Sequence, residues 1–148
     1  YLNGERTGEG IFKCVNGDKY VGQFKEGYMC GMGTYTWKNG DIYTGQWKND
    51  LQNGHGKLTK KSGDVFDGTF KDGKPDGQII IHYANGCKYK GTFKQGKRNG
   101  PAIEEDREGK RFEGSYLDDK RDGKFVEKDR NGKIVKTGHY EGGRRFDD

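Results

Sequence analysis

Two segments of the chain resemble the phosphate-binding loop of nucleotide-binding proteins. Residues 68–74 and 91–97 both have the pattern Gly-x-x-x-x-Gly-Lys, in which glycines and a lysine would cradle phosphate groups. The Ser or Thr that binds magnesium in such a loop is missing, because Pro75 and Arg98 follow the two lysines. Both segments are expected to form hairpins, which lack the helix N-terminus that completes a phosphate site. We therefore predict that neither segment binds a nucleotide.

The acidic run Glu104-Glu105-Asp106 could serve in acid–base catalysis or hold a cation. No second cluster of carboxylates accompanies it in the sequence, so a solvated acidic strand edge is expected instead. The serines Ser62 and Ser115 have no base beside them. The histidines fall in different phases of a sequence repeat and are expected on the surface: His55, His82 and His139. The sequence therefore predicts no enzyme activity and no cofactor.

The cysteines Cys14, Cys30 and Cys87 are odd in number and widely spaced. Without a Cys-x-x-Cys pair or companion histidines, they predict neither a disulfide framework nor a zinc site. Free thiols are typical of a reducing compartment. We therefore expect a cytoplasmic location, at the cytoskeleton or at the periphery of a membrane.

The composition favours a structure built without a large apolar core. Only 28% of the residues are hydrophobic and 34% are charged, which alone is typical of disorder. The net charge is only +5, however, and the chain contains 27 glycines together with eight Phe, nine Tyr and two Trp. The longest apolar run, residues 79–81, is far shorter than the ~20 residues that span a membrane. A repetitive β-structure is therefore expected.

The sequence repeats every 23 residues. An aromatic residue opens each of five complete copies and is counted here as position 0: Tyr20, Tyr43, Phe66, Tyr89 and Phe112. Position +2 is Gly in all five copies, and position +4 is again aromatic: Phe24, Trp47, Phe70, Phe93 and Tyr116. Further glycines recur at +7, +11, +13 and +20. A truncated copy occupies residues 1–19 and a partial copy begins at about residue 135, so residues 1–148 are predicted to be one repeat array.

Each copy is predicted to form one β-hairpin. Residues 43–48 place aromatic residues and Gly on one face and polar residues on the other, which indicates a strand. A second strand is expected after the +11 glycine, and pairs such as Asn39-Gly40 suit the positive φ angles of a tight hairpin turn. The predicted fold is all-β, an elongated single-layer antiparallel meander of β-hairpin repeats, roughly 58 Å long at about 4.8 Å per strand.

A single layer offers its aromatic residues no second sheet to pack against. Their rings are therefore expected to lie flat over neighbouring glycines, where the missing Cβ leaves room. On this argument the glycines at +2 and +11 are structural, because a Cβ at either position would collide with a ring.

The combined motif, aromatic-x-Gly-x-aromatic-x-x-Gly-x-x-x-Gly-x-Gly at a period of 23 residues, resembles the MORN repeat (membrane occupation and recognition nexus). The match is strictest in the copies that begin at Tyr20 and Tyr43, whereas Ile79, Ala102 and Phe125 replace the +13 glycine in later copies. The resemblance implies a single-layer sheet that serves as a scaffold for partner proteins, and the family name also implies a role at membranes.

Our first hypothesis is a non-enzymatic scaffold that binds a peptide or helix of a partner protein along the groove of the sheet. The predicted contacts are aromatic: Tyr20, Phe24, Tyr43, Trp47, Phe66 and Phe70. Further contacts are expected in one loop that is apolar where the other copies are polar: Tyr28, Met29, Cys30 and Met32. The alternative for this loop is that it caps the truncated first copy.

The second hypothesis is a peripheral membrane module that binds anionic phospholipids. Lysine recurs at position +5, on the face opposite the aromatic residues, and neighbouring cations extend the stripe: Lys25, Lys48, Lys71 and Lys94, with Lys74, Lys97 and Arg98. The alternative is a solubilising column. Because the stripe has no interleaved aromatic residues, nucleic acid is not an expected partner.

A third hypothesis is a targeting or regulatory domain of a larger enzyme, since the chain starts in the middle of a repeat. The open ends of the sheet also suggest pairing with a second copy of the chain.

Overall fold

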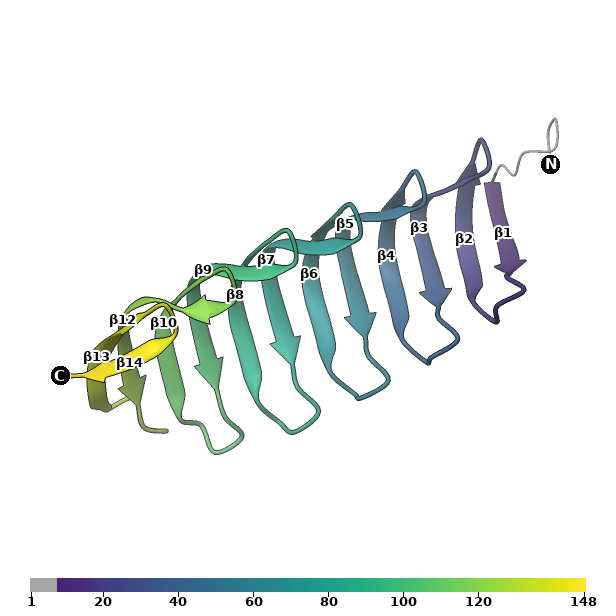
Figure 1. Ribbon diagram of the computed structural model, residues 1–148. Helices are drawn as coiled ribbons and strands as arrows, with labels where there is room; N and C mark the ends of the chain where they lie inside the picture. The colour runs from purple at the N-terminus through teal and green to yellow at the C-terminus, as the bar shows by residue number, and fades with distance from the viewer. Residues whose placement is uncertain (1–7) are drawn as a thin grey trace. The chain divides into compact units, whose positions relative to one another are not determined.

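The computed structural model describes residues 8–148, and every regular element among them is a β-strand (Figure 1). Residues 1–7, the start of the predicted truncated copy, lie outside the described residues. None of the described residues belongs to a helix that could cross a membrane. The chain divides into two compact units, residues 1–74 (unit 1) and residues 75–148 (unit 2).

Unit 1 is one layer of antiparallel sheet in which each strand pairs with the next along the chain. Its strands are β1 (Gly8–Lys13), β2 (Lys19–Lys25), β3 (Tyr28–Thr36), β4 (Ile42–Lys48), β5 (Leu51–Thr59) and β6 (Val65–Lys71). The period-two alternation of residues 43–48 therefore predicts a strand correctly. The second strand of a copy begins at Tyr28 or Leu51, however, and not after the +11 glycine where it was expected.

Unit 2 is built in the same way, in the order β7-β8-β9-β10-β12-β13-β14, with the short β11 pairing to β10. Its strands are β7 (Lys74–His82), β8 (Lys88–Lys94), β9 (Lys97–Glu105), β10 (Arg111–Leu117), β11 (Lys120–Arg121), β12 (Gly123–Lys128), β13 (Ile134–Glu141) and β14 (Arg144–Asp147). The prediction of an all-β antiparallel meander of hairpin repeats is thus confirmed.

The tight turns lie at the opposite ends of the strands from those predicted. Strands β2 and β3 are joined by two residues of positive φ, Glu26 (53°) and Gly27 (82°), and β4 and β5 by Asn49 (48°) and Asp50 (69°). Positive φ at both central residues is the type I′ turn, whose twist matches that of a hairpin. The two-residue turn therefore falls at positions +6 and +7.

The Asn-Gly pairs occupy wider loops instead. Between β3 and β4, Trp37 N–H donates to the Asp41 carbonyl (2.9 Å) and Gly40 N–H to the Trp37 carbonyl (3.0 Å). Gly40 has positive φ, but Asn39 does not. The Asn39 side chain accepts the Asp41 N–H (2.9 Å), so asparagine is suited to this loop by its side-chain oxygen and not by its backbone.

The +11 glycines lie in bulges. Gly22 pairs with Gly33 but Gln23 pairs with Cys30, so Gly31 and Met32 are extra residues of β3. The Gln23 side chain accepts the Met32 N–H (2.9 Å), and a Cβ on Gly31, whose φ is 61°, would collide with that side chain. The predicted collision of the +11 residue with an aromatic ring is therefore wrong, because the neighbour is the +3 glutamine.

The rings do lie over the other glycines. A Cβ on Gly56 would meet the tip of the Tyr43 ring, at 2.5 Å from Cε2, and a Cβ on Gly45 would be 2.5 Å from the Gly56 Cα. The +2 and +13 glycines therefore bring two strands and one ring into close contact. The buried core of unit 1 consists of aromatic rings: Tyr20, Phe24, Tyr43, Trp47 and Phe70.

Candidate functional site

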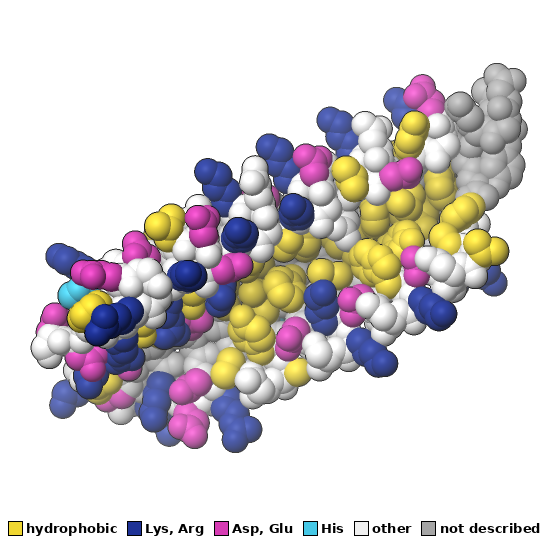
Figure 2. Space-filling model, viewed as in Figure 1, with side chains coloured by type: hydrophobic (Ala, Val, Ile, Leu, Met, Phe, Trp, Pro, Cys, Tyr) yellow, Lys and Arg dark blue, Asp and Glu magenta, His cyan; other side chains and the backbone are white. Residues whose placement is uncertain are grey.

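A row of half-buried apolar side chains covers the core of unit 1. These residues pack on the buried rings while keeping part of their surface in solvent, and we call them the aromatic surface: Phe12, Met29, Tyr35, Trp37, Leu58 and Phe66. They share the face of the buried rings, because Tyr35 lies opposite Tyr20 and Tyr43 in the strand pairings. Over the strands of unit 1, Figure 2 shows hydrophobic side chains gathered in a band along this face.

Tyr35 and Trp37 form the centre of the aromatic surface. Their ring centroids are 4.7 Å apart, and that of Tyr35 is 5.8 Å from Trp47. The Tyr35 hydroxyl donates to the Asp18 carboxylate (2.8 Å), and burial together with this hydrogen bond raises the pKa of Tyr35. The Trp47 ring is held in place by a hydrogen bond, which its indole N–H donates to the Gly33 carbonyl (3.2 Å). The exposed rings are therefore held in one arrangement before any partner binds.

Most of the predicted aromatic contacts are core residues. Tyr20 and Tyr43 are 0% exposed, and Phe24, Trp47 and Phe70 are also buried, so none of these five presents its ring to a partner. Burial raises the pKa of Tyr20 and of Tyr43 to about 12. Of the six predicted aromatic contacts, Phe66 alone belongs to the aromatic surface. Tyr35 and Trp37 were missed, although their spacing by two residues places both on the face of the +13 glycine.

The apolar segment from Tyr28 is not a loop but the first part of β3. Met29 lies opposite Phe24 and packs on the core, whereas Tyr28 and Cys30 lie opposite Lys25 and Gln23 on the other face. Tyr28 and Met32 are 49% and 54% exposed. The predicted contact residues are thus divided between the two faces. The cap on the first copy would involve residues 1–7, which lie outside the described residues.

The predicted lysine stripe lies at the strand ends beside the tight turns. In unit 1 Lys25, Lys48 and Lys71 end β2, β4 and β6 and are exposed. Lys74, the last residue of unit 1, begins β7, and in unit 2 Lys94 and Lys97 flank one turn. Acidic residues share the turns and reduce the local positive charge: Glu26, Asp50, Asp72, Asp118 and Asp119.

Arg98 does not belong to this stripe. Its guanidinium lies 4.5 Å from the centre of the Tyr116 ring, and its Nε is 3.2 Å from Asp119 Oδ1. The ion pair with Asp119 raises the pKa of Arg98 against the effect of burial. The side chain is therefore occupied within unit 2.

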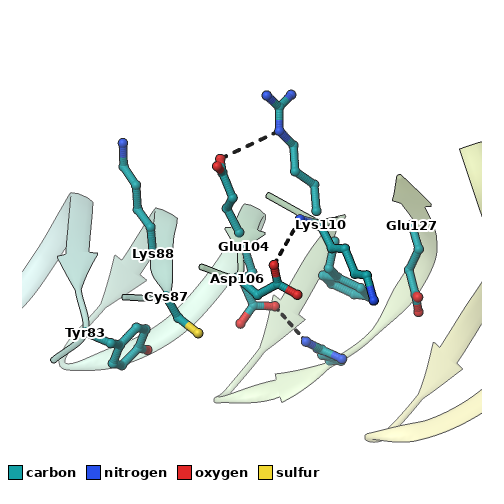
Figure 3. A pocket seen from close by; sticks show the side chains of 11 residues that line it. Tyr83, Cys87, Lys88, Glu104, Asp106, Lys110 and Glu127 are labelled. Atoms are coloured by element: carbon teal, nitrogen blue, oxygen red, sulfur yellow. Dashed lines mark hydrogen bonds and ion pairs between the residues drawn. The ribbon is translucent and has the colours of Figure 1, made fainter. Parts of the chain in front are cut away.

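The acidic run of unit 2 lines a cavity of about 370 Å³ (Figure 3). Glu104 bonds the Arg121 guanidinium (2.8 Å) and accepts the Tyr116 hydroxyl (2.9 Å), and Asp106 accepts the Lys110 N–H (3.0 Å). The prediction of a solvated acidic edge is wrong for Glu104, because this carboxylate is engaged in the face of the sheet. No group of metal-ligating side chains occurs in the described part of the chain.

Arg121 joins the contacts of this cavity. Its guanidinium lies 3.8 Å from the centre of the Phe112 ring and donates to the Tyr140 hydroxyl (3.1 Å). These hydrogen bonds raise the pKa of Arg121 although burial opposes the charge. The Glu104 carboxylate and the Arg121 guanidinium therefore bind one another across this face of unit 2.

The family model of the MORN repeat matches six consecutive segments: residues 1–19, 20–42, 43–65, 66–88, 89–111 and 112–133. The chain belongs to the MORN repeat family. No curated protein sequence matches it.

Solved structures that are similar to this MORN chain include two TCP domains. The TCP10 domain of Danio rerio CPAP has 14% sequence identity and a TM-score of 0.41, over 90% of this chain and 68% of that chain. The TCP domain of Drosophila melanogaster SAS-4 (dCPAP), in complex with a proline-rich motif of Ana2 (dSTIL), has 15% identity and a TM-score of 0.44, over 94% of this chain and 88% of that chain.

The MORN copies of the two units differ in the side chains that lie over their aromatic rings. In unit 2 position +9 is Pro75, Arg98 and Arg121, and the two guanidinium groups lie over aromatic rings. Among the described residues of unit 1 the same position is Met29 and then Gln52. Since Gln52 is buried and Met29 packs on the core, the rings of Tyr35 and Trp37 stay partly uncovered. The aromatic surface of unit 1 is therefore the best candidate for a binding site.

Proposed function

We propose that this MORN array is a protein-interaction module and that the aromatic surface of unit 1 binds an apolar segment of a partner, a peptide or a helix. MORN repeats are generally protein- or membrane-interaction modules. The observation that carries the proposal is the pair of half-buried rings, Tyr35 and Trp37, 4.7 Å apart on a packed core. Rigid aromatic side chains offer a large contact area at a small cost in conformational entropy.

The residues with catalytic potential support binding rather than catalysis. Glu104 and Arg121 bond each other, and Asp106 bonds the backbone of its own loop. The three cysteines are free thiols and are partly buried. Contacts within the sheet thus account for Glu104, Asp106 and Arg121.

Peptides selected from a displayed random library on the immobilised chain are the probe that tests this proposal. Trp37→Ala should weaken the selected peptides by more than about tenfold. Tyr28→Ala is the matched control, because Tyr28 is an exposed aromatic residue on the opposite face. Peptides that bind the Trp37→Ala variant as well as the wild type would contradict the proposal, provided that circular dichroism shows both variants folded.

A spectroscopic measurement gives an independent answer. The chain has two tryptophans, and Trp47 is buried whereas Trp37 is only partly buried. In a Trp47→Phe variant the fluorescence therefore comes from Trp37. A bound peptide should shift this emission to shorter wavelength and protect it from acrylamide. An emission that is unchanged at saturating peptide would place the contact elsewhere.

A second candidate function is binding to anionic membranes. The exposed lysines Lys25, Lys48 and Lys71 at successive strand ends favour it, since each cation near an anionic surface contributes about 1 kcal/mol. Flotation with vesicles of phosphatidylserine and phosphatidylcholine tests this function. Changing the three lysines together to Glu should abolish flotation, and a wild-type chain that fails to float at low salt would exclude it.

A further inference from the structure

Lysine side chains border the aromatic surface of unit 1 on the side of its wider loops. We call Lys38, Lys60 and Lys61 the cationic border. Lys38 follows Trp37 directly, and Lys60 occupies the position of Trp37 one repeat later. Figure 2 shows Lys and Arg side chains along both margins of the hydrophobic band. An apolar contact surface thus lies next to a group of positive charges.

The repeat itself holds two of these lysines in place. The Cγ atom of Lys38 lies 3.2 Å from the position that a Cβ on Gly17 would occupy, and that of Lys61 lies 3.3 Å from the same position on Gly40. Glycine at +20 therefore lets the aliphatic stem of each lysine lie over the preceding loop. The ammonium groups extend beyond it, into solvent.

The carboxylates of the same loops bind the backbone. Asp18 accepts the Lys38 N–H (2.7 Å), and Asp41 accepts the Lys61 N–H (2.8 Å). Asp41 also lies 3.6 Å from the Lys60 ammonium. Within residues 8–148, neither Lys38 nor Lys61 lies within ion-pair distance of a carboxylate, although Asp18 attracts the Lys38 ammonium at longer range. Lys61 is therefore the cation of the border that is most available to a partner.

Trp37 adds a hydrogen-bond donor to this arrangement. Its indole N–H donates to no acceptor among the described residues, although the ring packs against Tyr35. An indole N–H is a donor only, so its natural complement is a carboxylate or a carbonyl oxygen. The ring, the free donor and the neighbouring lysines thus favour a ligand that is both apolar and acidic.

We propose that the aromatic surface binds an acidic peptide segment of a partner protein. Apolar side chains of the segment pack on Tyr35 and Trp37, and its Asp or Glu carboxylates meet the cationic border. This inference rests on the proposed function above and specifies its partner. Charge complementarity selects the segment, because a basic peptide of equal apolar content would be repelled by the same lysines.

The experiment uses the same displayed peptide library on the folded chain. Peptides that depend on Trp37 should be rich in Asp and Glu, and replacing these residues by Asn and Gln should weaken their binding by about tenfold. Lys61→Glu should weaken binding by a similar factor. Lys57→Glu is the matched control: it makes the same charge change at an exposed residue opposite Thr44, on the other face of β5, and should change binding by less than about twofold.

Each other outcome overturns the inference in a recognisable way. Peptides that require Trp37 but are neutral or basic, or that ignore Lys61→Glu, would overturn the acidic partner and leave the proposed function intact. If no selected peptide requires Trp37, both fail. Flotation with phosphatidylserine vesicles that is lost in Trp37→Ala and in Lys61→Glu would assign the surface to a membrane. A dimer in sedimentation that requires Trp37 would assign it to a second copy of the chain.

Discussion

The ring of Tyr20 lies over Gly33, and its Cε1 atom is 2.5 Å from the position that a Cβ on residue 33 would occupy. The hydroxyl group reaches past the glycine and donates a hydrogen bond to the Gln23 carbonyl (2.9 Å). In the copy that begins at Phe112, by contrast, position +13 is Phe125, and the two rings stack with centroids 5.5 Å apart. The side chain at +13 thus decides how far the ring at position 0 extends.

Gly33→Ala should lower the free energy of unfolding by more than about 2 kcal/mol, because the Tyr20 ring cannot move away without leaving the core. Urea denaturation measures this change. Gly10→Ala is the control, since a Cβ there would lie 3.7 Å from Phe24, in ordinary contact, and should cost less than about 0.5 kcal/mol. Equal stabilities of the two variants would refute the steric explanation.

Tyr89→Phe should leave unit 2 as stable as the wild type, or more so. The Tyr89 hydroxyl is buried and has no hydrogen-bond partner in the described part of the chain. Its copy has Ala102 at position +13 in place of glycine. Tyr43→Phe removes the bond to the Gln46 carbonyl (3.0 Å) and should cost about 1 kcal/mol. Thermal unfolding compares the two variants. A larger loss of stability for Tyr89→Phe than for Tyr43→Phe would contradict the absence of a hydrogen-bond partner for the Tyr89 hydroxyl.

Asp18→Asn should flatten the dependence of stability on pH in acid. The hydrogen bond from the Lys38 N–H, followed by that from the Tyr35 hydroxyl, holds the pKa of Asp18 below its ordinary value of 3.8. A depressed pKa in the folded state means that the carboxylate stabilises the fold above pH 3.8 and that this contribution is lost as the pH falls further. Melting temperatures of the wild type and the variant should therefore converge below pH 3.8. A constant difference between them would show that the charge is irrelevant.

Arg121→Met should destabilise unit 2 by more than about 1 kcal/mol, because it leaves the Glu104 carboxylate without its cation. Adding Glu104→Gln should recover part of this loss, and the double-mutant cycle measures the coupling. Arg107→Met, at an exposed arginine, should change stability by less than about 0.5 kcal/mol. Additive effects at residues 104 and 121 would mean that the ion pair is not coupled.

The repeat, the strands and the contact of rings with glycines follow from the sequence because they depend on residues of one copy. Tyr43 and Gly56, for example, belong to the same hairpin, so the period alone relates them. The turns were assigned less well. Asn39 satisfies a loop by its side chain, whereas Asn49 and Asp50 adopt positive φ without glycine at either position. Residue type alone does not separate these two uses.

The candidate site was harder to predict because it depends on contacts between copies. Tyr35 and Tyr43 share one face and one alternation, yet Tyr43 is fully buried and Tyr35 is not. Which row is covered depends on rings of other copies, such as Phe70 of the next copy, which packs against Tyr43 (5.1 Å between centroids). The sequence likewise predicts a surface cation at Arg98. It does not show that the guanidinium lies over the ring of Tyr116, because that ring belongs to the next copy.

Carboxylate side chains of unit 1 bind the backbone of neighbouring copies at both ends of the strands. The loop of the copy from Tyr20 is held by Asp18 of the copy before it, through the Lys38 N–H, and the turn of the copy from Tyr43 is held by Met29 of the copy before it, through Asp50. Asp18 thus binds the copy that follows it, whereas Asp50 binds the copy that precedes it. Every such interface is held from both of its sides, so shortening the array by one copy breaks the same two contacts at either end.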